Sequence, residues 1–385
     1  MAIVLFDNTF REQLFPLTLT KAVADLRCGI LTFKERWELI SGKTVFVKSV
    51  DYLKALYPSI EDADAVWIDA GIIPAKELTD RILSLQSGQA LADENGLIAG
   101  KSSKLLLSFS LENSLQLFDE VFDVSAVKRL EYPSQIVQWN DCMIRSDFEL
   151  ITKDKTSQPI SHTNQVISQA DIFIDENATV EFCTLNSSTG PIYIGKDAVL
   201  MEGSMIRGPF AFGENSLLKM GAKIYGATSI GPNCVAGGEI KNVVIQANSN
   251  KAHDGYLGDS VIGEWCNMGA GTSNSNVKNT GGEVKLWNRY TKLFMPAGQK
   301  CGVVMGDYSR TAINSSINTG SIIGVCCNVF GEGLLPKVID DFSWGLNRKY
   351  EFEKALRDIN NWKKMKHQHV SDAEIAVLKY IFERM

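Results

Sequence analysis

Residues 194–236 read IGKDAVLMEGSMIRGPFAFGENSLLKMGAKIYGATSIGPNCVA. Every sixth position in this stretch holds an apolar or small residue: Ile194, Leu200, Ile206, Phe212, Leu218, Ile224, Ile230 and Ala236. A period of six fits neither the 3.6-residue repeat of an α-helix nor the simple alternation of a strand. It is typical of a parallel β-helix, whose coils contain three short strands with every sixth side chain pointing inward. The sequence therefore predicts a β-helix of hexapeptide repeats.

The same period returns further along the chain in shifted frames. The repeated positions there are Tyr256, Ile262, Met268, Met305, Thr311, Ile317, Ile323 and Val329. We expect the coils to run from about Val166 to Val338, with loops at 242–254 and 274–302. In repeat proteins such insertions usually collect on one functional face.

Composition indicates a soluble protein with more than one domain. The chain has 385 residues, a net charge of −6, 45% hydrophobic and 22% charged residues. No cluster of lysine and arginine points to nucleic acid or to an anionic membrane. The sequence contains no apolar run long enough to span a bilayer, and Met1–Asp7 lacks a signal peptide's basic segment, so we expect a cytoplasmic protein. The eight cysteines show no metal-ligand spacing, and we expect reduced thiols.

The residues before the coils have a different pattern. Apolar runs at 3–6, 44–47 and 65–68 alternate with amphipathic stretches at 33–40, 51–56 and 75–85, which predicts an α/β domain with a mainly parallel sheet. We expect this α/β (Rossmann-like) domain to cover 1–155 and the β-helix 156–346. Residues 347–385 have helical spacing and are expected to cap the coil or to pack on a neighbour.

Histidine is scarce, which narrows the possible chemistry. The chain has four histidines: His162, His253, His367 and His369. A catalytic zinc site of the three-histidine type is therefore not expected in the coil. His253 stands among polar residues in the predicted loop at 242–254, where a neutral imidazole suits general base catalysis. The alternative is a solvated loop histidine with no role.

Short motifs around His253 resemble a known family. They read KAH at 251–253, YLGD at 256–259 and NMGAGT at 267–272. They are similar to the acetyltransferase domain of the bifunctional N-acetylglucosamine-1-phosphate uridyltransferase/glucosamine-1-phosphate acetyltransferase family, GlmU. The later NSSINTG at 314–320 and FSWG at 342–345 resemble a divergent branch, the GlmU-like sugar nucleotidyltransferases. The resemblance covers the coil well and implies that the β-helix is left-handed.

The resemblance also implies roles for single residues. His253 would be the base that deprotonates the acceptor amine, with Glu239 orienting it. Lys223 and Lys241 would hold the sugar phosphate. Tyr256, Asn267 and Asn276 would position the sugar, and Asn267 would belong to the catalytic residues together with His253 and Glu239. Ala270 and Gly271 would face acetyl-CoA, with a backbone N–H stabilising the oxyanion. A homotrimer with sites between subunits is expected from the same resemblance.

Some positions depart from the family pattern. Val277 replaces an aromatic residue, and Ile313 replaces a serine that contacts the acyl donor. Gly282 stands where a basic residue is expected, although Lys278 and Lys285 are near enough to substitute. The identity of the sugar, and whether the acyl donor is strictly acetyl-CoA, therefore do not follow from the resemblance.

The beginning of the chain echoes a sugar-phosphate nucleotidyltransferase. Arg11 and Lys21 follow the first predicted strand at positions that suit nucleotide phosphates, but the glycines of a phosphate loop are absent. Asp69 ends a later predicted strand and is a candidate Mg²⁺ ligand. An active transferase, a remnant and a sugar-nucleotide binder all remain open for this domain.

These observations predict an acetyl-CoA-dependent N-acetyltransferase acting on an amino-sugar phosphate, fused to a sugar-1-phosphate nucleotidyltransferase domain that uses UTP or dTTP. One alternative is a nucleotidyltransferase whose β-helix only trimerises or regulates. Another is a protein that binds ligands or serves as a scaffold without catalysis.

Overall fold

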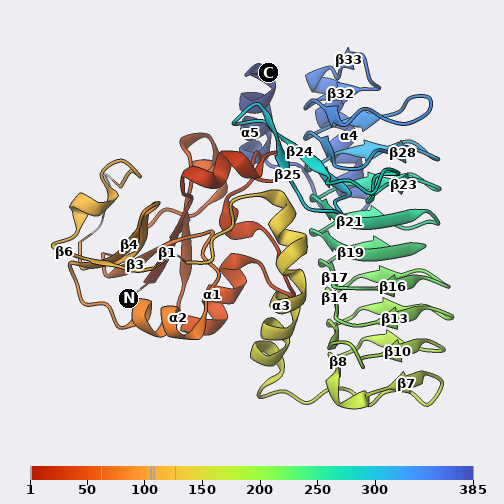
Figure 1. Cartoon of the computed structure of the whole chain (residues 1–385), viewed down its shortest axis with the longest axis horizontal. Coiled ribbons are helices and arrows are strands. Elements are labelled where there is room, and N and C mark those ends of the chain that lie inside the picture. Colours follow the sequence, from red (N-terminus) through yellow and green to blue (C-terminus); the bar gives the residue numbers. More distant parts are fainter. Residues whose placement is uncertain (1, 62, 105, 107–108, 126, 385) are drawn as a thin grey trace. The chain divides into compact units, whose positions relative to one another are not determined.

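The computed structural model describes residues 2–61, 63–104, 106, 109–125 and 127–384 (Figure 1). The chain forms two compact units. The first contains Met1–Leu14, Lys21–Leu26 and Leu31–Tyr132, and the second contains Phe15–Thr20, Arg27–Ile30 and Pro133–Met385.

The first unit is built on a six-stranded sheet in the order β2-β1-β3-β5-β4-β6. Its strands are β1 (Ala2–Phe6), β2 (Val45–Lys48), β3 (Ala65–Asp69), β4 (Gln89–Asp93), β5 (Gly96–Ser102) and β6 (Glu120–Asp123). β1 runs parallel to β2 and β3, as predicted, and these apolar strands are fully or half buried, as is usual in parallel sheets. β5 is antiparallel to both β3 and β4, so the sheet is mixed.

The helices of this unit match the predicted amphipathic stretches. α1 (Phe33–Ser41) begins with a capping box, in which Thr32 accepts from the Glu35 N–H and Glu35 accepts from the Thr32 N–H. α2 covers Lys76–Leu83. The stretch at 51–56 is a 3₁₀ helix, η3 (Asp51–Leu56). The remaining 3₁₀ segments of the unit are η1 (Thr9–Leu14), η2 (Val23–Asp25) and η4 (Ser114–Leu117).

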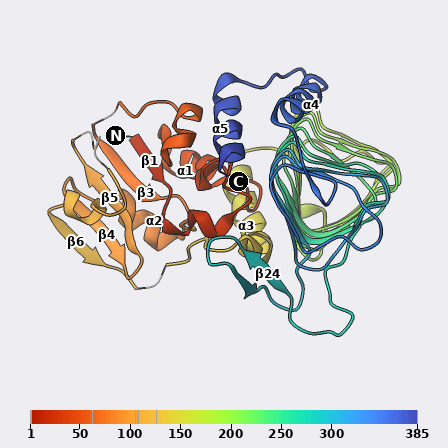
Figure 2. The same ribbon diagram turned by 90° about the horizontal axis from the view of Figure 1, so that it is seen from above.

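The second unit contains the predicted parallel β-helix, whose strands stack on three faces (Figure 2). The first face contains β7 (Gln165–Ile167), β10 (Thr184–Asn186), β13 (Met205–Arg207), β16 (Lys223–Tyr225), the first parts of β19 (Glu239–Ile245) and β21 (Tyr256–Ile262), β23 (Ser273–Asn274) and β28 (Ser316–Ile317). The second contains β8 (Ile172–Ile174), β11 (Ile192–Ile194), β14 (Phe210–Phe212), β17 (Thr228–Ile230), the second parts of β19 and β21, β26 (Val303–Met305), β29 (Ser321–Ile323) and β31 (Val338–Ile339). The third contains β9 (Thr179–Val180), β12 (Val199–Leu200), β15 (Leu217–Leu218), β18 (Val235–Ala236), β20 (Asn250–Lys251), β22 (Asn267–Met268), β27 (Arg310–Thr311), β30 (Asn328–Val329), β32 (Ser343–Trp344) and a final antiparallel β33 (Arg348–Lys349). A 3₁₀ segment, η5 (Gln169–Asp171), lies in the first coil.

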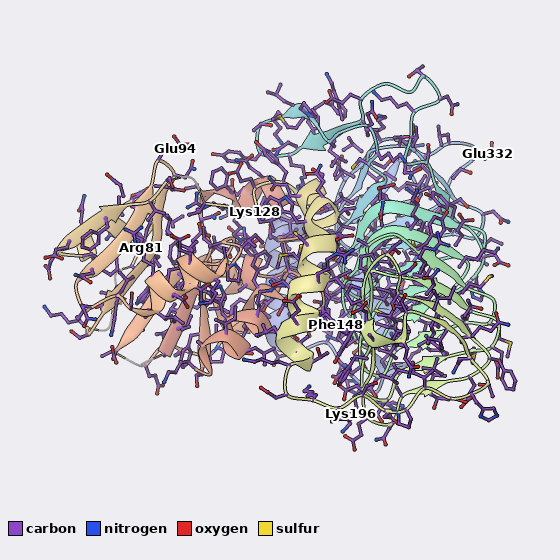
Figure 3. All side chains as sticks on the ribbon, turned by 60° about the horizontal axis from the view of Figure 1, so that its bottom comes forward. Arg81, Glu94, Lys128, Phe148, Lys196 and Glu332 are labelled. Atoms are coloured by element: carbon purple, nitrogen blue, oxygen red, sulfur yellow. The ribbon has the colours of Figure 1, made fainter. Side chains whose placement is uncertain are left out.

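The hexapeptide period sets which side chains point inward. Ile194, Phe212 and Ile230 pair in register in neighbouring coils and are at most 1% exposed. Charged side chains stand between the inward positions and face outward, as Figure 3 shows for Lys196 and Glu332. Asn215 and Asn233 turn the chain at coil corners with positive φ, which asparagine tolerates better than most residues. The predicted fold class is therefore confirmed: an α/β domain followed by a hexapeptide β-helix and a helical tail.

The first predicted interruption of the coils was wrong. Residues 242–254 are not a loop, because β19 continues from the first face into the second and β20 follows on the third. Ile230 pairs with Ile245 and Ile245 pairs with Ile262, so these two coils are shorter than the regular 18-residue spacing of Ile194 and Phe212. The shortened coils, and not an insertion, shift the frame of the repeat.

The second interruption is confirmed. Between β23 and β26 the chain leaves the coils and forms an antiparallel hairpin of β24 (Lys285–Asn288) and β25 (Leu293–Pro296) (Figure 2). Trp287 and Phe294 pack across it, with ring centroids 5.1 Å apart.

Three further helices belong to the second unit. α3 (Pro133–Thr152) packs on the coils, where the buried Asn140 donates to the Ala227 carbonyl at 2.9 Å and accepts from the Ser229 hydroxyl at 3.0 Å. The sequence boundary expected at 155 lies just beyond this helix. α4 (Phe352–Lys364) and α5 (Asp372–Glu383) confirm the helical tail. They pack along the side of the coils, through Trp362 on Arg310 and Glu374 on Tyr308.

Candidate functional site

The first face of the β-helix carries a cluster of polar side chains on neighbouring strands. Lys223 on β16, Glu239 on β19 and Tyr256 on β21 are consecutive partners in parallel register. Tyr225 and Lys241 form a second column of partners two residues along the same strands. Neighbouring strands lie about 4.8 Å apart and side chains two residues apart share a face. We call these five residues the polar face.

Tyr225 is the residue of the polar face that sequence reasoning missed. Its hydroxyl donates to Glu239 Oε1 at 2.6 Å, and Lys241 Nζ lies 5.5 Å from the centre of its ring. The hydrogen bond to Glu239, together with burial, raises the pKa of Tyr225 to about 12. The phenol therefore keeps its proton at neutral pH and holds the Glu239 carboxylate in place.

A second hydrogen-bonded chain borders the polar face. Asn276 donates to the Tyr256 hydroxyl at 3.0 Å and also to Asp259. Asn242 donates to the other Asp259 oxygen at 3.2 Å. Burial, followed by the charge of Asp259, raises the pKa of Tyr256. The structure thus joins two predicted sugar-binding residues, Tyr256 and Asn276.

His253 is an exposed residue at the corner between β20 and β21, three residues before Tyr256. The preceding coil turns at Gly238, where a Cβ would come within 2.7 Å of the His253 carbonyl oxygen. The next coil turns at Ala270 and Gly271, and the Gly271 N–H donates to the Asp254 carbonyl at 2.9 Å. The structure therefore brings His253 and the predicted acetyl-CoA residues to the same corner of adjacent coils.

Lys251 supports this corner from inside the β-helix. It occupies an inward position in register with Ala236 and is 2% exposed. Its ammonium donates to the Gly237 carbonyl at 3.2 Å and to the His253 carbonyl. Burial lowers the pKa of Lys251 to about 8. A lysine at an inward repeat position is the sequence signal that could have identified it.

Asn267 lies on a different face from Glu239. It is on β22 of the third face, in register with Asn250, whose amide approaches its oxygen at 3.5 Å. Asn250 in turn accepts from Lys366, which follows α4. The predicted catalytic role of Asn267 stays a prediction, as does the use of Lys278 or Lys285 in place of Gly282. Lys278 Nζ donates to the Glu283 carbonyl.

In the first unit, the predicted nucleotide-binding residues are buried. Arg11 is 3% exposed and contacts Asp7 at 3.0 Å and the Tyr52 hydroxyl at 2.8 Å. Lys21 is 6% exposed. Burial raises the pKa of Asp7, while Arg11 acts in the opposite direction. The roles of Arg11 and Lys21 in binding a nucleotide remain predictions.

Asp69 ends β3, where the sequence predicts a Mg²⁺ ligand. Its carboxylate accepts from Asn8 at 2.7 Å and from Arg129 at 2.6 Å, and Arg129 also binds Asp93 at 2.8 Å. Within the described residues, no group of three or more histidine, cysteine or acidic side chains could hold a metal ion. Because Mg²⁺ prefers available oxygen ligands, carboxylates already bound to arginine do not fit such a site as they stand. The metal role of Asp69 stays a prediction.

Comparison with known proteins agrees with this architecture. Residues 3–156 match the family model for sugar nucleotidyl transferases. The chain is 32% identical over 102 residues to the bifunctional protein GlmU of Methanocaldococcus jannaschii, which covers 26% of this chain and 24% of that protein. It is 38% identical over 92 residues to a bifunctional sugar-1-phosphate nucleotidylyltransferase/acetyltransferase of Sulfurisphaera tokodaii, covering 24% and 23%. Parts of this chain are therefore similar to GlmU-type bifunctional proteins.

The GlmU-like match is partial. GlmU of Methanococcus vannielii is 37% identical over 97 residues, and the chain spans about a quarter of the length of the curated relatives it matches. The solved structure of an Arabidopsis UDP-N-acetylglucosamine acyltransferase is 18% identical and covers 58% of this chain and 90% of its own, with a TM-score of 0.28. That score is too low to support an argument. Among the described residues, no helix is long and apolar enough to cross a membrane.

Proposed function

We propose that the second unit is an N-acetyltransferase that moves an acetyl group from acetyl-CoA to an amino-sugar phosphate, with His253 as the general base. The observation that carries this proposal is the polar face, whose Lys223–Glu239–Tyr256 column ends beside the corner where His253 and Ala270 lie. The sequence similarity to GlmU-like bifunctional proteins supports the same assignment.

Each residue of the proposed site has a role that follows from its chemistry. Acetyl-CoA supplies an acetyl thioester when it is bound. His253 is exposed and can accept the proton that the acceptor amine loses on attack. The Gly271 N–H already donates to the Asp254 backbone carbonyl. We therefore assign stabilisation of the oxyanion to the Ala270 N–H. Lys223 and Lys241 provide the positive charge that a sugar phosphate requires.

We propose a second activity, sugar-1-phosphate nucleotidyl transfer with UTP or dTTP, for the residues that match the sugar nucleotidyl transferase family, 3–156. The buried ion pairs of Arg11 and Arg129 give this unit a defined charged centre at the ends of β1 and β3. The carboxylates there are bound to arginine and do not fit a Mg²⁺ site as they stand. The cytoplasmic location and the homotrimer also remain proposals.

The direct test incubates the purified chain with acetyl-CoA and glucosamine 1-phosphate and follows the N-acetylated product by mass spectrometry. Lys223→Met or Lys241→Met should raise the KM for the sugar phosphate about tenfold or more, because a hydrogen bond to a charged group contributes about 1.5–3 kcal/mol. Lys196→Ala is the matched control, since Lys196 is an exposed coil lysine that pairs with Glu176. Absence of product with the unmodified chain, both from glucosamine 1-phosphate and from its nucleoside-diphosphate derivative, would contradict the proposal.

A further inference from the structure

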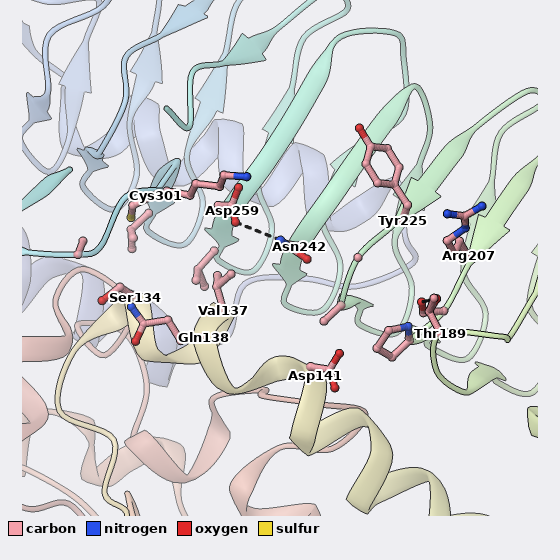
Figure 4. Close-up of a pocket in the computed structure, with 18 residues that line it drawn as sticks. Ser134, Val137, Gln138, Asp141, Thr189, Arg207, Tyr225, Asn242, Asp259 and Cys301 are labelled. Atoms are coloured by element: carbon pink, nitrogen blue, oxygen red, sulfur yellow. Dashed lines mark hydrogen bonds between the residues drawn. The ribbon is translucent and has the colours of Figure 1, made fainter. Parts of the chain in front are cut away.

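A cavity of about 500 Å³ lies between α3 and the coils of the second unit (Figure 4). Val137 and Gln138 line it from α3, and Ala227 and Val261 line it from the coils. Its volume is in the range of small-molecule pockets, which combine an apolar lining with a few polar groups. None of the roles assigned above uses this cavity.

The cavity is continuous with the polar face. Tyr225 lines it and donates to Glu239, and Asp259 lines it and accepts from Asn276. Figure 4 shows Tyr225 and Asp259 above α3, on coils that are separated by the coil of Asn242. The chain runs only six residues from His253 to Asp259, a reach of at most about 20 Å. A ligand that begins at His253 can therefore extend into the cavity.

Two cations, Arg207 and Lys300, line the cavity. Arg207 on β13 lines the cavity, and the register of β13 with β16 places it beside Tyr225, which has Lys241 on its other side. Lys300 lines the cavity from the base of the hairpin. Arg207, Tyr225 and Lys241 thus form a column of two positive charges around an aromatic ring.

The acidic groups of the cavity are already bound by donors. Asp141 pairs with Arg145 at 2.6 Å, and Asp259 accepts from Asn242 and Asn276. Asn242 and Asn276 are neutral, so Asp141 is paired with a cation and Asp259 is not, but Arg207, Lys241 and Lys300 outnumber Asp259. The site therefore has a cationic part, at Arg207 and Lys241, and a largely uncharged part, at Val137, Gln138 and Ala227. A ligand with phosphate groups and a flat heterocycle fits both, because the phosphate oxygens bind the cations and the heterocycle packs on the uncharged side chains.

We propose that the acceptor of the acetyl group is an amino sugar linked to a nucleoside diphosphate. This inference rests on the proposed acetyl transfer and specifies its substrate class. The amino sugar lies on the column of Glu239 and Tyr256, the diphosphate lies against Arg207 and Lys241, and the nucleoside occupies the cavity.

The reaction balances without further reactants. The amine nitrogen attacks the thioester carbonyl carbon, so that a C–N bond forms and the C–S bond breaks. His253 takes the proton from nitrogen and returns it to the departing thiolate. The nucleoside diphosphate is unchanged and serves only for recognition.

The test compares two acceptors with acetyl-CoA and the full chain: UDP-glucosamine and glucosamine 1-phosphate. We expect kcat/KM to be at least tenfold higher for the UDP-linked sugar. Val137→Trp, which fills the cavity from α3, and Arg207→Ala should each reduce that preference about tenfold. Lys196→Ala should leave the preference unchanged, and melting temperatures report whether each variant is folded.

The outcomes separate the two proposals. If neither acceptor is acetylated, the proposed acetyltransferase function fails. If glucosamine 1-phosphate is used as well as or better than UDP-glucosamine, acetyl transfer stands and the nucleotide-linked acceptor is wrong. If the preference exists but folded Val137→Trp and Arg207→Ala both retain it, the cavity is not the nucleoside site and the inference is overturned.

Discussion

The candidate sites of the two units place their charged side chains in opposite ways. In the first unit, Arg11 and Arg129 are 3% and 4% exposed and bind Asp7, Asp69 and Asp93 at the ends of strands. In the second unit, Lys223 is exposed, and Lys241 and Glu239 are partly exposed on the polar face. Buried pairs fix a structure because removal of either partner leaves a charge without water. An open face can exchange water for a ligand. The same residue types therefore support the fold in one unit and are available for binding in the other.

The largest expected effect is in the first unit. Arg129→Met leaves Asp69 and Asp93 buried without their shared cation, and should lower the free energy of unfolding by about 3–5 kcal/mol. Denaturant unfolding measures this loss. Lys76→Met removes an exposed pair with Asp80 on α2 and should change stability by less than about 1 kcal/mol. Equal effects of the two substitutions would contradict the contrast between buried and exposed charges.

The next prediction concerns Lys251, the buried lysine that supports the His253 corner, and the pH dependence of stability that it causes. Its pKa falls from the usual 10.5 to about 8 in the folded chain, so between these values the unfolded chain binds more protons. The free energy of unfolding should therefore rise with pH across this window, by about 3 kcal/mol in total, and this gain is lost as pH falls through 8.

The measurement for Lys251 compares unfolding of the unmodified chain and of Lys251→Met at pH 7.5 and pH 10. Tyrosines titrate in both proteins, so the difference between the two pH dependences isolates the lysine. Identical pH dependence in the two proteins would show that burial does not lower the pKa of this amine.

Tyr225→Phe should have a moderate effect on the polar face. It removes the donor that holds Glu239, and we expect kcat/KM for acetyl transfer to fall about tenfold, in line with the strength of a hydrogen bond to a charged group. Tyr193→Phe is the matched control, because Tyr193 donates to Asp175 at 3.1 Å on the second face. If both variants lose the same activity, the role of Tyr225 is structural.

The smallest effect is expected at the outer surface of the coils. Lys196→Ala removes a pair with Glu176 whose side chains are 48% and 65% exposed. Such pairs contribute about 0–1 kcal/mol, so the melting temperature and activity should barely change. A large loss would mean that outward charges stabilise the β-helix.

The repeat could be predicted because its inward residues recur at a fixed distance along the chain. Ile194, Phe212 and Ile230 are separated by whole coils, so the sequence period predicts that they are buried. The shortened coils around Ile245 shift that frame, and a break in the period was read as a loop. The period alone cannot distinguish a shorter coil from an insertion.

Helix α3 and Tyr225 show what the sequence could not supply. The buried side of α3 includes Asn140 and Asp147, whose polar atoms bind backbone groups of Ala227 and Ile30, and this interrupts the apolar stripe. Tyr225 contacts Glu239 because the coil that joins their strands brings Glu239 into register with Lys223, two residues before Tyr225. The column of Lys223, Glu239 and Tyr256 was predicted from the family resemblance.

The most direct test of the central claim is the rate of acetyl transfer by His253→Ala, measured with binding of acetyl-CoA to the same sample. His162→Ala is the control, because His162 is also exposed and precedes the first coil. We predict that His253→Ala binds acetyl-CoA and loses about 10²–10⁴-fold in kcat, the usual contribution of a general base, while His162→Ala keeps its rate. An unchanged rate in folded His253→Ala would contradict the assignment of the active site to this corner of the β-helix.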